Sequence, residues 1–346
     1  MTPYLTRPTG LVLTLLVFAA CDPTPTEPSA AASALAEAEL AVGVNSWTSP
    51  APMPSDRYWP AVAVVPNSQG QSILYAIGGS RDVTRVPLGN VQAYNAATNH
   101  WTSRAALPVA LYNTNGAGAI DGKIYVTGGM DYQNRIQASV YMYDPATNQW
   151  TRKKDMPARG FGGITGVYQN RLYVMTSCDN VPNCATERGG VGIFRYNPAT
   201  DNWRFLSPAH GDHVFGMGGF LGGKFYLTGG VSAEPRASLD VYDPATNSWQ
   251  TGAPMPAGRT RAAYATIEGK LYLAGGSEED LTSPNHDFVQ SRSVIRYDPV
   301  GNKWSTLAPL PKAQQGLSGG RVVVTSTLRF EVVGGPRPGN NFQYTP

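Results

Sequence analysis

Short apolar runs alternate with polar turn residues through residues 45–346, and the same order of runs recurs along the chain. In each period, a run of small apolar residues leads to a tight polar turn such as DGK at residues 121–123. A second run then ends in a double glycine, as in KIYVTGG at residues 123–129. A third run ends in Tyr, and a turn of the YDPATN type leads to a fourth run that contains Trp. Short apolar runs bounded by turn residues predict four strands per period.

The segment from Tyr to Trp is the most regular part of each period. Its five complete copies are YNAATNHW (94–101), YDPATNQW (143–150), YNPATDNW (196–203), YDPATNSW (242–249) and YDPVGNKW (297–304). From Trp101 to Trp304 there are four periods of about 51 residues each, a spacing in the range of propeller blades. Pro presets a turn and Asn tolerates the left-handed conformation, so the third and fourth strands are predicted to be antiparallel neighbours.

The two ends of the chain carry fragments of one further copy. Asn45, Ser46 and Trp47 finish a copy that has no Tyr, while Tyr344, Thr345 and Pro346 begin a copy that has no Trp. We expect the amino-terminal strand to complete a blade whose other three strands come from the carboxyl end. Such closure of a ring removes an unpaired sheet edge.

The double glycine followed by Tyr and Trp at this spacing resembles the Kelch repeat, a four-stranded blade of a β-propeller. The resemblance covers residues 45–346, and blade three departs from it with Ser177 and Cys178 in place of the glycines. It implies an all-β fold, a six-bladed Kelch-type β-propeller whose last blade is closed by the N-terminal outer strand (3+1). The six blades are counted on Trp residues 47, 101, 150, 203, 249 and 304.

The first twenty residues have the pattern of an export signal, with Arg7, an apolar run at 11–18, and small residues before Cys21. The apolar run is too short to span a bilayer. The segment Phe-Ala-Ala-Cys resembles a bacterial lipobox, which implies cleavage before Cys21 and lipidation of that residue. An ordinary cleaved signal followed by an unrelated Cys is the alternative.

Three parts of the chain are therefore expected. They are a signal peptide at 1–20, a lipidated Cys with a flexible tether at 21–44, and the propeller at 45–346. The protein is expected to be exported and lipid-anchored in the cell envelope, on the periplasmic side or the cell surface. Its contact with the membrane would run only through the N-terminal anchor.

Charge excludes one class of partner. Charged residues make up 15% of the chain, the net charge is +3, and the densest basic run is the triplet at residues 152–154. This charge pattern gives no electrostatic footprint for nucleic acid. We expect a monomer that needs no cofactor and no metal. The segment GLSGG around Ser318 formally matches a hydrolase elbow, but an apolar strand follows it where a helix is required.

The longer and more variable loops share one face of the predicted propeller, so this loop face is the expected binding surface. Aligning the copies on their turns places Tyr112, His213 and Arg259 at equivalent positions at the mouth of the central channel, with Arg57 and Arg159 nearby. A loop that follows a double glycine adds Asp131. The candidate ligand-binding residues are Arg57, Tyr112, Asp131, Arg159, His213 and Arg259. The alternative is that these Arg side chains tie neighbouring blades together through backbone carbonyls.

Two other loops contain groups with possible chemistry. Cys178 and Cys184 are expected to form a disulfide in an oxidising compartment, with free thiols or a metal site as alternatives. The segment SEEDLTSPNHD at 277–287 gathers four carboxylates and His286. A divalent cation and a solvated acidic loop are both compatible with it, and the solvated loop is favoured.

The favoured function is a non-enzymatic binding module for a protein or carbohydrate ligand at the loop face around the channel. The alternative is a small-sugar epimerase or mutarotase similar to the bacterial periplasmic Kelch sialic acid epimerases. The inner strands are chiefly Gly, Ala and Val and offer few catalytic groups, which favours binding. A copper radical oxidase like the propeller-borne galactose oxidases would need more His than the four in this chain.

Overall fold

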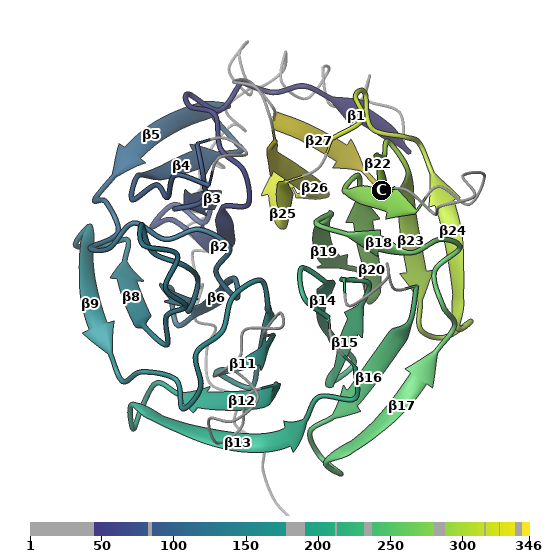
Figure 1. Ribbon diagram of the computed structural model, residues 1–346. Coiled ribbons are helices and arrows are strands. Elements are labelled where there is room, and N and C mark those ends of the chain that lie inside the picture. The colour runs from purple at the N-terminus through teal and green to yellow at the C-terminus, as the bar shows by residue number, and fades with distance from the viewer. Residues whose placement is uncertain are drawn as a thin grey trace, which may run out of the picture. The chain divides into compact units, whose positions relative to one another are not determined.

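The computed structural model describes residues 45–81, 85–177, 191–211, 213–231, 237–279, 288–314, 316–324, 326–335 and 341–346. These residues belong to a compact unit that spans Val42–Pro346. Within it, six antiparallel sheets of four strands each form a ring (Figure 1). The prediction of an all-β, six-bladed Kelch-type propeller is confirmed. The predicted boundaries of the signal peptide and tether lie outside the described residues.

The blades are numbered here in chain order, each from the inner strand to the outer strand. Blade 1 contains β2 (Ala61–Pro66), β3 (Ser72–Ile77), β4 (Val91–Asn95) and β5 (His100–Arg104). Blade 2 contains β6 (Ala117–Ile120), β7 (Lys123–Thr127), β8 (Val140–Asp144) and β9 (Gln149–Lys153). Blade 3 contains β10 (Ile164–Tyr168), β11 (Arg171–Thr176), β12 (Gly192–Asn197) and β13 (Asn202–Pro208).

The second half of the ring repeats this order. Blade 4 contains β14 (Met217–Leu221), β15 (Lys224–Thr228), β16 (Leu239–Asp243) and β17 (Ser248–Gly252). Blade 5 contains β19 (Ala263–Ile267), β20 (Lys270–Ala274), β23 (Val294–Asp298) and β24 (Lys303–Leu307). Blade 6 contains β25 (Leu317–Val324), β26 (Thr327–Gly334), β27 (Asn341–Thr345) and β1 (Ser46–Thr48). A small extra sheet is formed by β18 (Arg259–Thr260), β21 (Ser277–Glu279) and β22 (Phe288–Gln290).

Burial follows the position of each strand in its blade. The second strand lies between neighbouring blades, and all six residues of β3 are buried. The outer strand has one face in solvent, so β5 buries only its Trp101. This difference explains why the second strands are continuous apolar runs while the outer strands are polar around one Trp.

The YDPATN turn links each blade to the one before it. Asn99 has φ of 52°, and its side-chain oxygen accepts hydrogen bonds from the Tyr94 hydroxyl at 3.0 Å and the Ala51 amide at 2.6 Å. The Trp101 indole N–H donates to the Ala51 carbonyl at 2.9 Å. Asn148 and Trp150 make the same contacts with Tyr143 and Ala105. The left-handed Asn therefore closes the turn, and the Trp finds its acceptor in the preceding blade.

The split copy at the chain ends is rebuilt in blade 6. Trp47 pairs with Tyr344 in the β1–β27 ladder, and the Tyr344 hydroxyl donates to the Asn45 side-chain oxygen at 2.8 Å. The Trp47 indole N–H donates to the Ala308 carbonyl at 2.8 Å, as the complete copies predict. The predicted closure of the ring by the N-terminal strand is confirmed.

The double glycines lie at the end of the second strand. The entry segments, which lead into the first strand of the same blade and of the next blade, pass close to them. Gly79 has φ of 92°, and a Cβ built on it would be 2.5 Å from the Tyr58 carbonyl oxygen. Its amide donates to the Leu111 carbonyl of the next blade at 2.9 Å. Both the positive φ and the close approach require glycine at this position.

Candidate functional site: the mouth of the central channel

The inner strands of the six blades surround a central cavity of about 610 Å³, lined mainly by small residues. The glycines on these strands also serve the packing between blades. A Cβ on Gly118 would be 2.4 Å from the Leu172 side chain, and one on Gly166 would be 2.8 Å from Phe220. Small inner residues therefore let neighbouring blades approach, and the cavity is what this packing leaves at the axis.

Arg57 lies in the segment that enters blade 1, and its side chain is fully buried. Its Nη1 atom donates to the Ala76 and Asn90 carbonyls, each at 2.9 Å, and Nη2 lies 3.3 Å from the Gln92 side-chain oxygen. Its own carbonyl accepts from the Gly335 amide of blade 6. Burial lowers the pKa of Arg57 to about 10. Arg57 thus joins blades 6 and 1, which is the structural alternative stated for these Arg residues.

Arg259 has the same role between blades 4 and 5. Its Nη1 atom donates to the Gly275 carbonyl at 3.0 Å and the Ser293 carbonyl at 2.9 Å, and Glu278 forms an ion pair with it at 3.1 Å. Its carbonyl accepts from the Gly230 amide of blade 4. Burial lowers the pKa of Arg259, and Glu278 partly opposes this shift. With 1% of its surface exposed, this side chain has little access to a ligand.

His213 occupies the equivalent position at the entry to blade 4. Its Nδ1 lies 2.7 Å from the Gly229 carbonyl oxygen, and its Nε2 lies 2.9 Å from an oxygen of Asp240. A carbonyl oxygen and an ionised carboxylate can each only accept hydrogen bonds. Both ring nitrogens therefore act as donors in this arrangement. Burial alone would raise the pKa of Asp240, but hydrogen bonds from His213 and His210 lower it. His213 thus lies where blades 1 and 5 have Arg57 and Arg259, and both of its ring nitrogens face hydrogen-bond acceptors.

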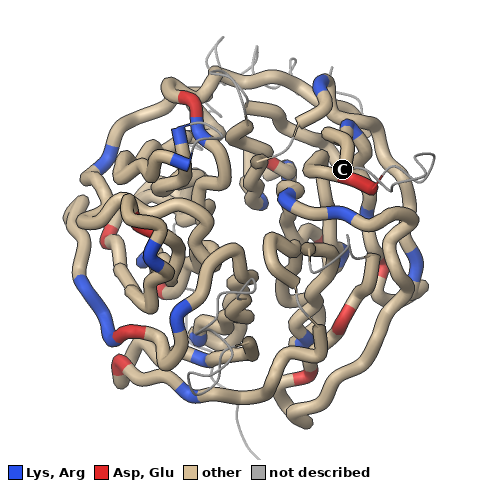
Figure 2. Tube along the Cα trace, viewed as in Figure 1, with Lys and Arg blue, Asp and Glu red and all other residues tan. Residues whose placement is uncertain are grey.

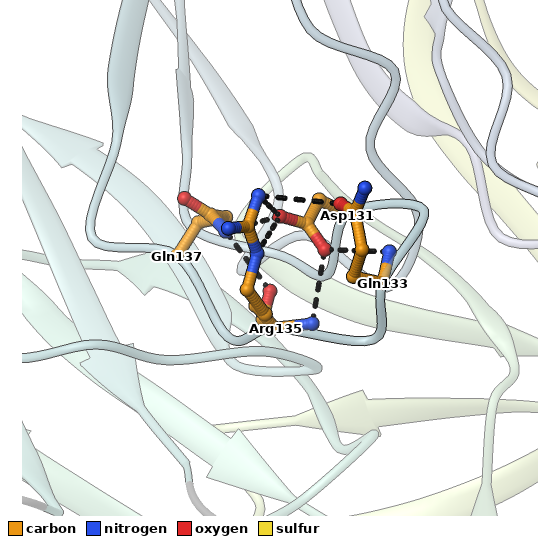
Figure 3. A network of polar contacts seen from close by, with 4 residues as sticks. All are labelled: Asp131, Gln133, Arg135 and Gln137. Carbon is orange, nitrogen blue, oxygen red and sulfur yellow. Dashed lines mark hydrogen bonds and ion pairs between the residues drawn. The ribbon is translucent and has the colours of Figure 1, made fainter.

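Tyr112 and Asp131 stabilise a loop of blade 2, and Figure 3 shows the contacts of Asp131. Asp131 accepts from the Gln133 amide at 2.9 Å, from the Arg135 amide at 3.0 Å, and from the side chains of Arg135 and Gln137 at 2.8 and 2.9 Å. Burial opposes ionisation of this carboxyl, yet these hydrogen bonds lower its pKa. The buried Tyr112 hydroxyl donates to the Asn134 side chain of the same loop at 2.6 Å.

The structure changes one part of the predicted alignment. Leu111 and Gly160 accept hydrogen bonds from Gly79 and Gly129, as Arg57 accepts one from Gly335. Leu111 and Gly160 are therefore the residues equivalent to Arg57, His213 and Arg259. Tyr112 lies one position later, and the exposed Arg159 lies one position earlier. The alignment error arises because the segments that enter the blades differ in length and composition.

Six residues, one from each blade, form what we call the mouth ring at the loop-face end of the channel. All have a left-handed backbone, and their φ angles are 52° for Trp59, 47° for Asn113, 59° for Gly162, 57° for Phe215, 56° for Arg261 and 74° for Gly316. Backbone hydrogen bonds join ring members from neighbouring blades. The Trp59 amide donates to Gly316 at 2.9 Å, and the Phe215 amide donates to Gly162 at 2.7 Å. A left-handed conformation in Trp, Phe and Arg is costly and is often found at functional sites.

The side chains of the mouth ring gather around a cavity of about 80 Å³. The Arg261 guanidinium lies 4.0 Å from the centre of the Phe215 ring and 5.7 Å from that of Trp59. Asn113 is 7% exposed. Within the described residues, its side-chain oxygen and the Trp59 indole N–H are buried without a hydrogen-bond partner. Tyr264 lines both this cavity and the larger channel cavity.

This arrangement places aromatic side chains and one cation at the mouth, beside one buried donor and one buried acceptor that have no partner among the described residues. Sugars and peptides use such groups, because their hydroxyl, carboxylate and amide atoms pair with the polar groups while apolar surfaces stack on the rings. The sequence reasoning missed these residues. A usable signal existed, since Trp59, Phe215 and Arg261 follow Arg57, His213 and Arg259, respectively, by two positions.

The remaining candidate groups are the cysteines, the acidic loop, possible metal ligands and Ser318. Cys21, Cys178, Cys184 and most of the acidic loop at 277–287 lie outside the described residues. Among the residues that are described, no group of three or more His, Cys, Asp or Glu could hold a metal ion. No helix in the described ranges is long and apolar enough to cross a membrane. Ser318 lies within β25 and donates to the Pro60 carbonyl at 2.7 Å, which agrees with the exclusion of a hydrolase elbow.

Comparison with known proteins supports the fold and the repeat. The Kelch motif family matches residues 114–157, 218–256 and 258–311. Kelch-like protein 36 of Rattus norvegicus and that of Mus musculus are each 27% identical over 169 residues, which is 48% of this chain. The chain spans about a quarter of the length of these relatives, since the match covers 27% of each.

A solved structure of YjhT has the same fold, with a TM-score of 0.66 and 17% sequence identity. The similarity covers 84% of this chain and 95% of that one. Repeat, sheet order and fold thus define a propeller built from Kelch motifs. The chain therefore contains Kelch motifs and has the fold of a Kelch-type β-propeller.

Proposed function

We propose that this protein is a binding module that holds a protein or glycan ligand at the mouth ring. The observation that carries the proposal is the set of Trp59, Phe215 and Arg261 side chains, held at the channel mouth by a left-handed backbone beside unpaired polar atoms of Asn113 and Trp59. A strained backbone that places two aromatic rings and a cation around a cavity favours recognition.

Three of the carboxylates near the entry segments favour binding over catalysis. Asp131, Asp240 and Glu278 are each held by donors from neighbouring side chains. A general base needs a carboxylate or imidazole that can reach the proton of a substrate. A small-sugar epimerase remains the alternative function, and turnover of a sugar in the test below would establish it in place of simple binding.

Charge and export complete the proposal. Figure 2 shows Lys, Arg, Asp and Glu interspersed around the ring among the described residues, which fits a protein or glycan partner better than nucleic acid. The export signal and lipid anchor expected at residues 1–44 would place a monomeric propeller and its ligand in the cell envelope.

The test uses glycine substitutions that the fold already accepts. Gly162 and Gly316 occupy the mouth ring in two blades, so Trp59→Gly, Phe215→Gly and Arg261→Gly should keep the backbone conformation while removing the side chain. Purified protein would be screened on a glycan array, on a peptide library and for sugar isomerisation. Each of the three variants should weaken the selected interaction by about tenfold or more.

A matched control comes from the opposite face. Glu268 has φ of 48° in a tight turn where blade 4 has Gly222, so Glu268→Gly changes a left-handed residue without touching the mouth. This control should bind as the wild-type protein does. Wild-type binding by the three mouth variants would show that the ligand site lies elsewhere.

A further inference from the structure

A second cavity, of about 800 Å³, lies between blades 1 and 2 at the face of the tight turns, opposite the mouth ring. We call it the turn-face groove. Buried side chains of Val65, Ile73, Tyr75 and Ala93 form its floor on blade 1. The tight turns of blade 2 around Asp121 form the facing wall. A volume of this size can hold a small organic molecule.

The groove exists because of one small residue in the repeat. Ala93 immediately precedes the Tyr of the third strand and faces blade 2, where it belongs to the core cluster shared by the two blades. The other blades have larger residues at this position, namely Met142, Arg195, Val241, Arg296 and Gln343. Two of these side chains contact the second strand of their own blade, since Arg296 lies above Tyr272 at 6.0 Å and Gln343 donates to Glu331 at 2.8 Å. Ala93 leaves this space empty.

A polar atom points to a ligand in the groove. Tyr75 is 4% exposed and its ring packs against Tyr143 of blade 2, with 5.7 Å between ring centres. In the part of the chain that the structure describes, no hydrogen bond is made by its hydroxyl. The Tyr143 hydroxyl, by contrast, donates to Asn148 at 2.7 Å. A hydroxyl that faces a cavity and has no partner in the protein can donate to a bound molecule.

The rim of the groove carries Asp121, Asp144, Lys123 and Arg104, and Arg104 is the cation among them that has no ion pair in the described part of the chain. The Lys123 ammonium pairs with Asp144 at 2.5 Å, and Asp121 accepts from the Asn170 side chain at 3.2 Å. Arg104 is exposed on β5 and has no ion pair among the described residues. Burial raises the pKa of Tyr75, while the nearby Arg104 charge lowers it. The Arg104 charge therefore lies close enough to attract an anionic group that sits beside the Tyr75 hydroxyl.

We propose that the turn-face groove binds a soluble amphipathic organic anion, independently of the ligand at the mouth ring. The apolar body of the anion lies on Val65, Ile73 and Ala93. Its carboxylate or sulfonate accepts a hydrogen bond from the Tyr75 hydroxyl and pairs with Arg104.

The test is calorimetric titration of the full protein with decanoate, and with decan-1-ol as an uncharged match. Decanoate should bind at one site, and Ala93→Met, which copies Met142 of blade 2, should weaken it by about tenfold or more. Arg104→Gln and Tyr75→Phe should each weaken decanoate by about threefold, and Arg104→Gln should leave decan-1-ol binding unchanged. Trp59→Gly, which alters only the mouth ring, should leave decanoate binding unchanged.

Several results would overturn the proposal. These are the absence of saturable decanoate binding, wild-type affinity in a folded Ala93→Met variant, and binding to phosphatidylglycerol vesicles without binding of monomeric decanoate. Thermal unfolding of Ala93→Met checks its fold, and a melting temperature equal to or above that of the wild type is expected because the substitution fills a cavity.

Discussion

Glu331 provides a sharp test of the packing between the first and last blades. In the segment RFEVVGG it occupies the position that the other five blades fill with Tyr, namely Tyr75, Tyr125, Tyr173, Tyr226 and Tyr272. Its side chain is fully buried and accepts from the Gln343 side chain at 2.8 Å. Its second oxygen, Oε1, has no hydrogen-bond partner within the described chain. Burial raises the pKa of Glu331 to about 8, although Gln343, Asn341 and Arg329 oppose this shift.

This pKa makes the stability of the propeller depend on pH. The carboxyl titrates near 4.5 when the chain is unfolded and near 8 when it is folded. Between these values the folded chain keeps a proton that the unfolded chain has lost, so the contribution of Glu331 to stability is fully present below pH 4.5 and is lost as pH rises to 8. Each pH unit in this interval costs about 1.4 kcal/mol, and the whole interval costs roughly 5 kcal/mol at most.

The substitution Glu331→Gln removes the titration and keeps the shape of the side chain. Urea unfolding at pH 5, 6, 7, 8 and 9 would measure the free energy of unfolding of both proteins. We expect similar values near pH 5 and an advantage for the variant that grows by about 1.4 kcal/mol per pH unit up to pH 8. Glu268→Gln, at an exposed turn position where blade 3 has Gln169, is the control and should follow the wild-type curve. Parallel curves for Glu331→Gln and the wild type would refute the reasoning.

Three other predictions concern stability. Trp47→Ala should destabilise the fold by roughly 3–5 kcal/mol in urea unfolding because Trp47 packs against the buried core of blade 6. Removal of residues 1–42 should have little effect. An unaffected Trp47→Ala variant would contradict ring closure. Asp240→Asn should destabilise the fold by roughly 3 kcal/mol at pH 7 because a neutral amide replaces the carboxylate beside His213 and His210, and the cost should shrink as pH falls through the lowered pKa of Asp240; a constant cost from pH 7 to pH 2 would contradict a charged Asp240. Arg259→Ala should lower the melting temperature, and any loss of binding should follow the unfolded fraction; a stable variant without binding would instead make Arg259 a ligand residue.

The fold was predictable because the same local structural requirements recur in each blade and select the same residue types. The left-handed Asn99, the Trp101 indole that needs an acceptor and the paired glycines each require a particular residue type, so they recur in the sequence. Ring closure was predictable for the same reason, since Asn45 and Trp47 supply what Tyr344 lacks.

The site was harder to predict because its residues differ between blades. Arg57, His213 and Arg259 lie two positions before members of the mouth ring, but charge alone did not show that their partners are backbone carbonyls and carboxylates inside the protein. The mouth ring depends on a left-handed backbone that Trp59 and Phe215 adopt against their intrinsic preference. Sequence patterns do not reveal such a conformation when the residue is not Gly or Asn.

Buried polar residues were the other limit. Glu331 is an irregularity in an apolar strand, and Ala93 is unremarkable until its equivalents in the other blades are aligned. Both act across a boundary between blades, so their consequences depend on neighbours that are distant in sequence.

Hydrogen–deuterium exchange on the protein with its strongest ligand from the array and library screens tests the central claim most directly. The mouth-ring account predicts slower exchange at residues 57–61, 113–116, 213–217 and 260–264, where backbone amides such as that of Arg261 already donate from blade to blade. Protection restricted to the tight turns at 121–123 and 268–270, with no change at the mouth ring, would contradict it.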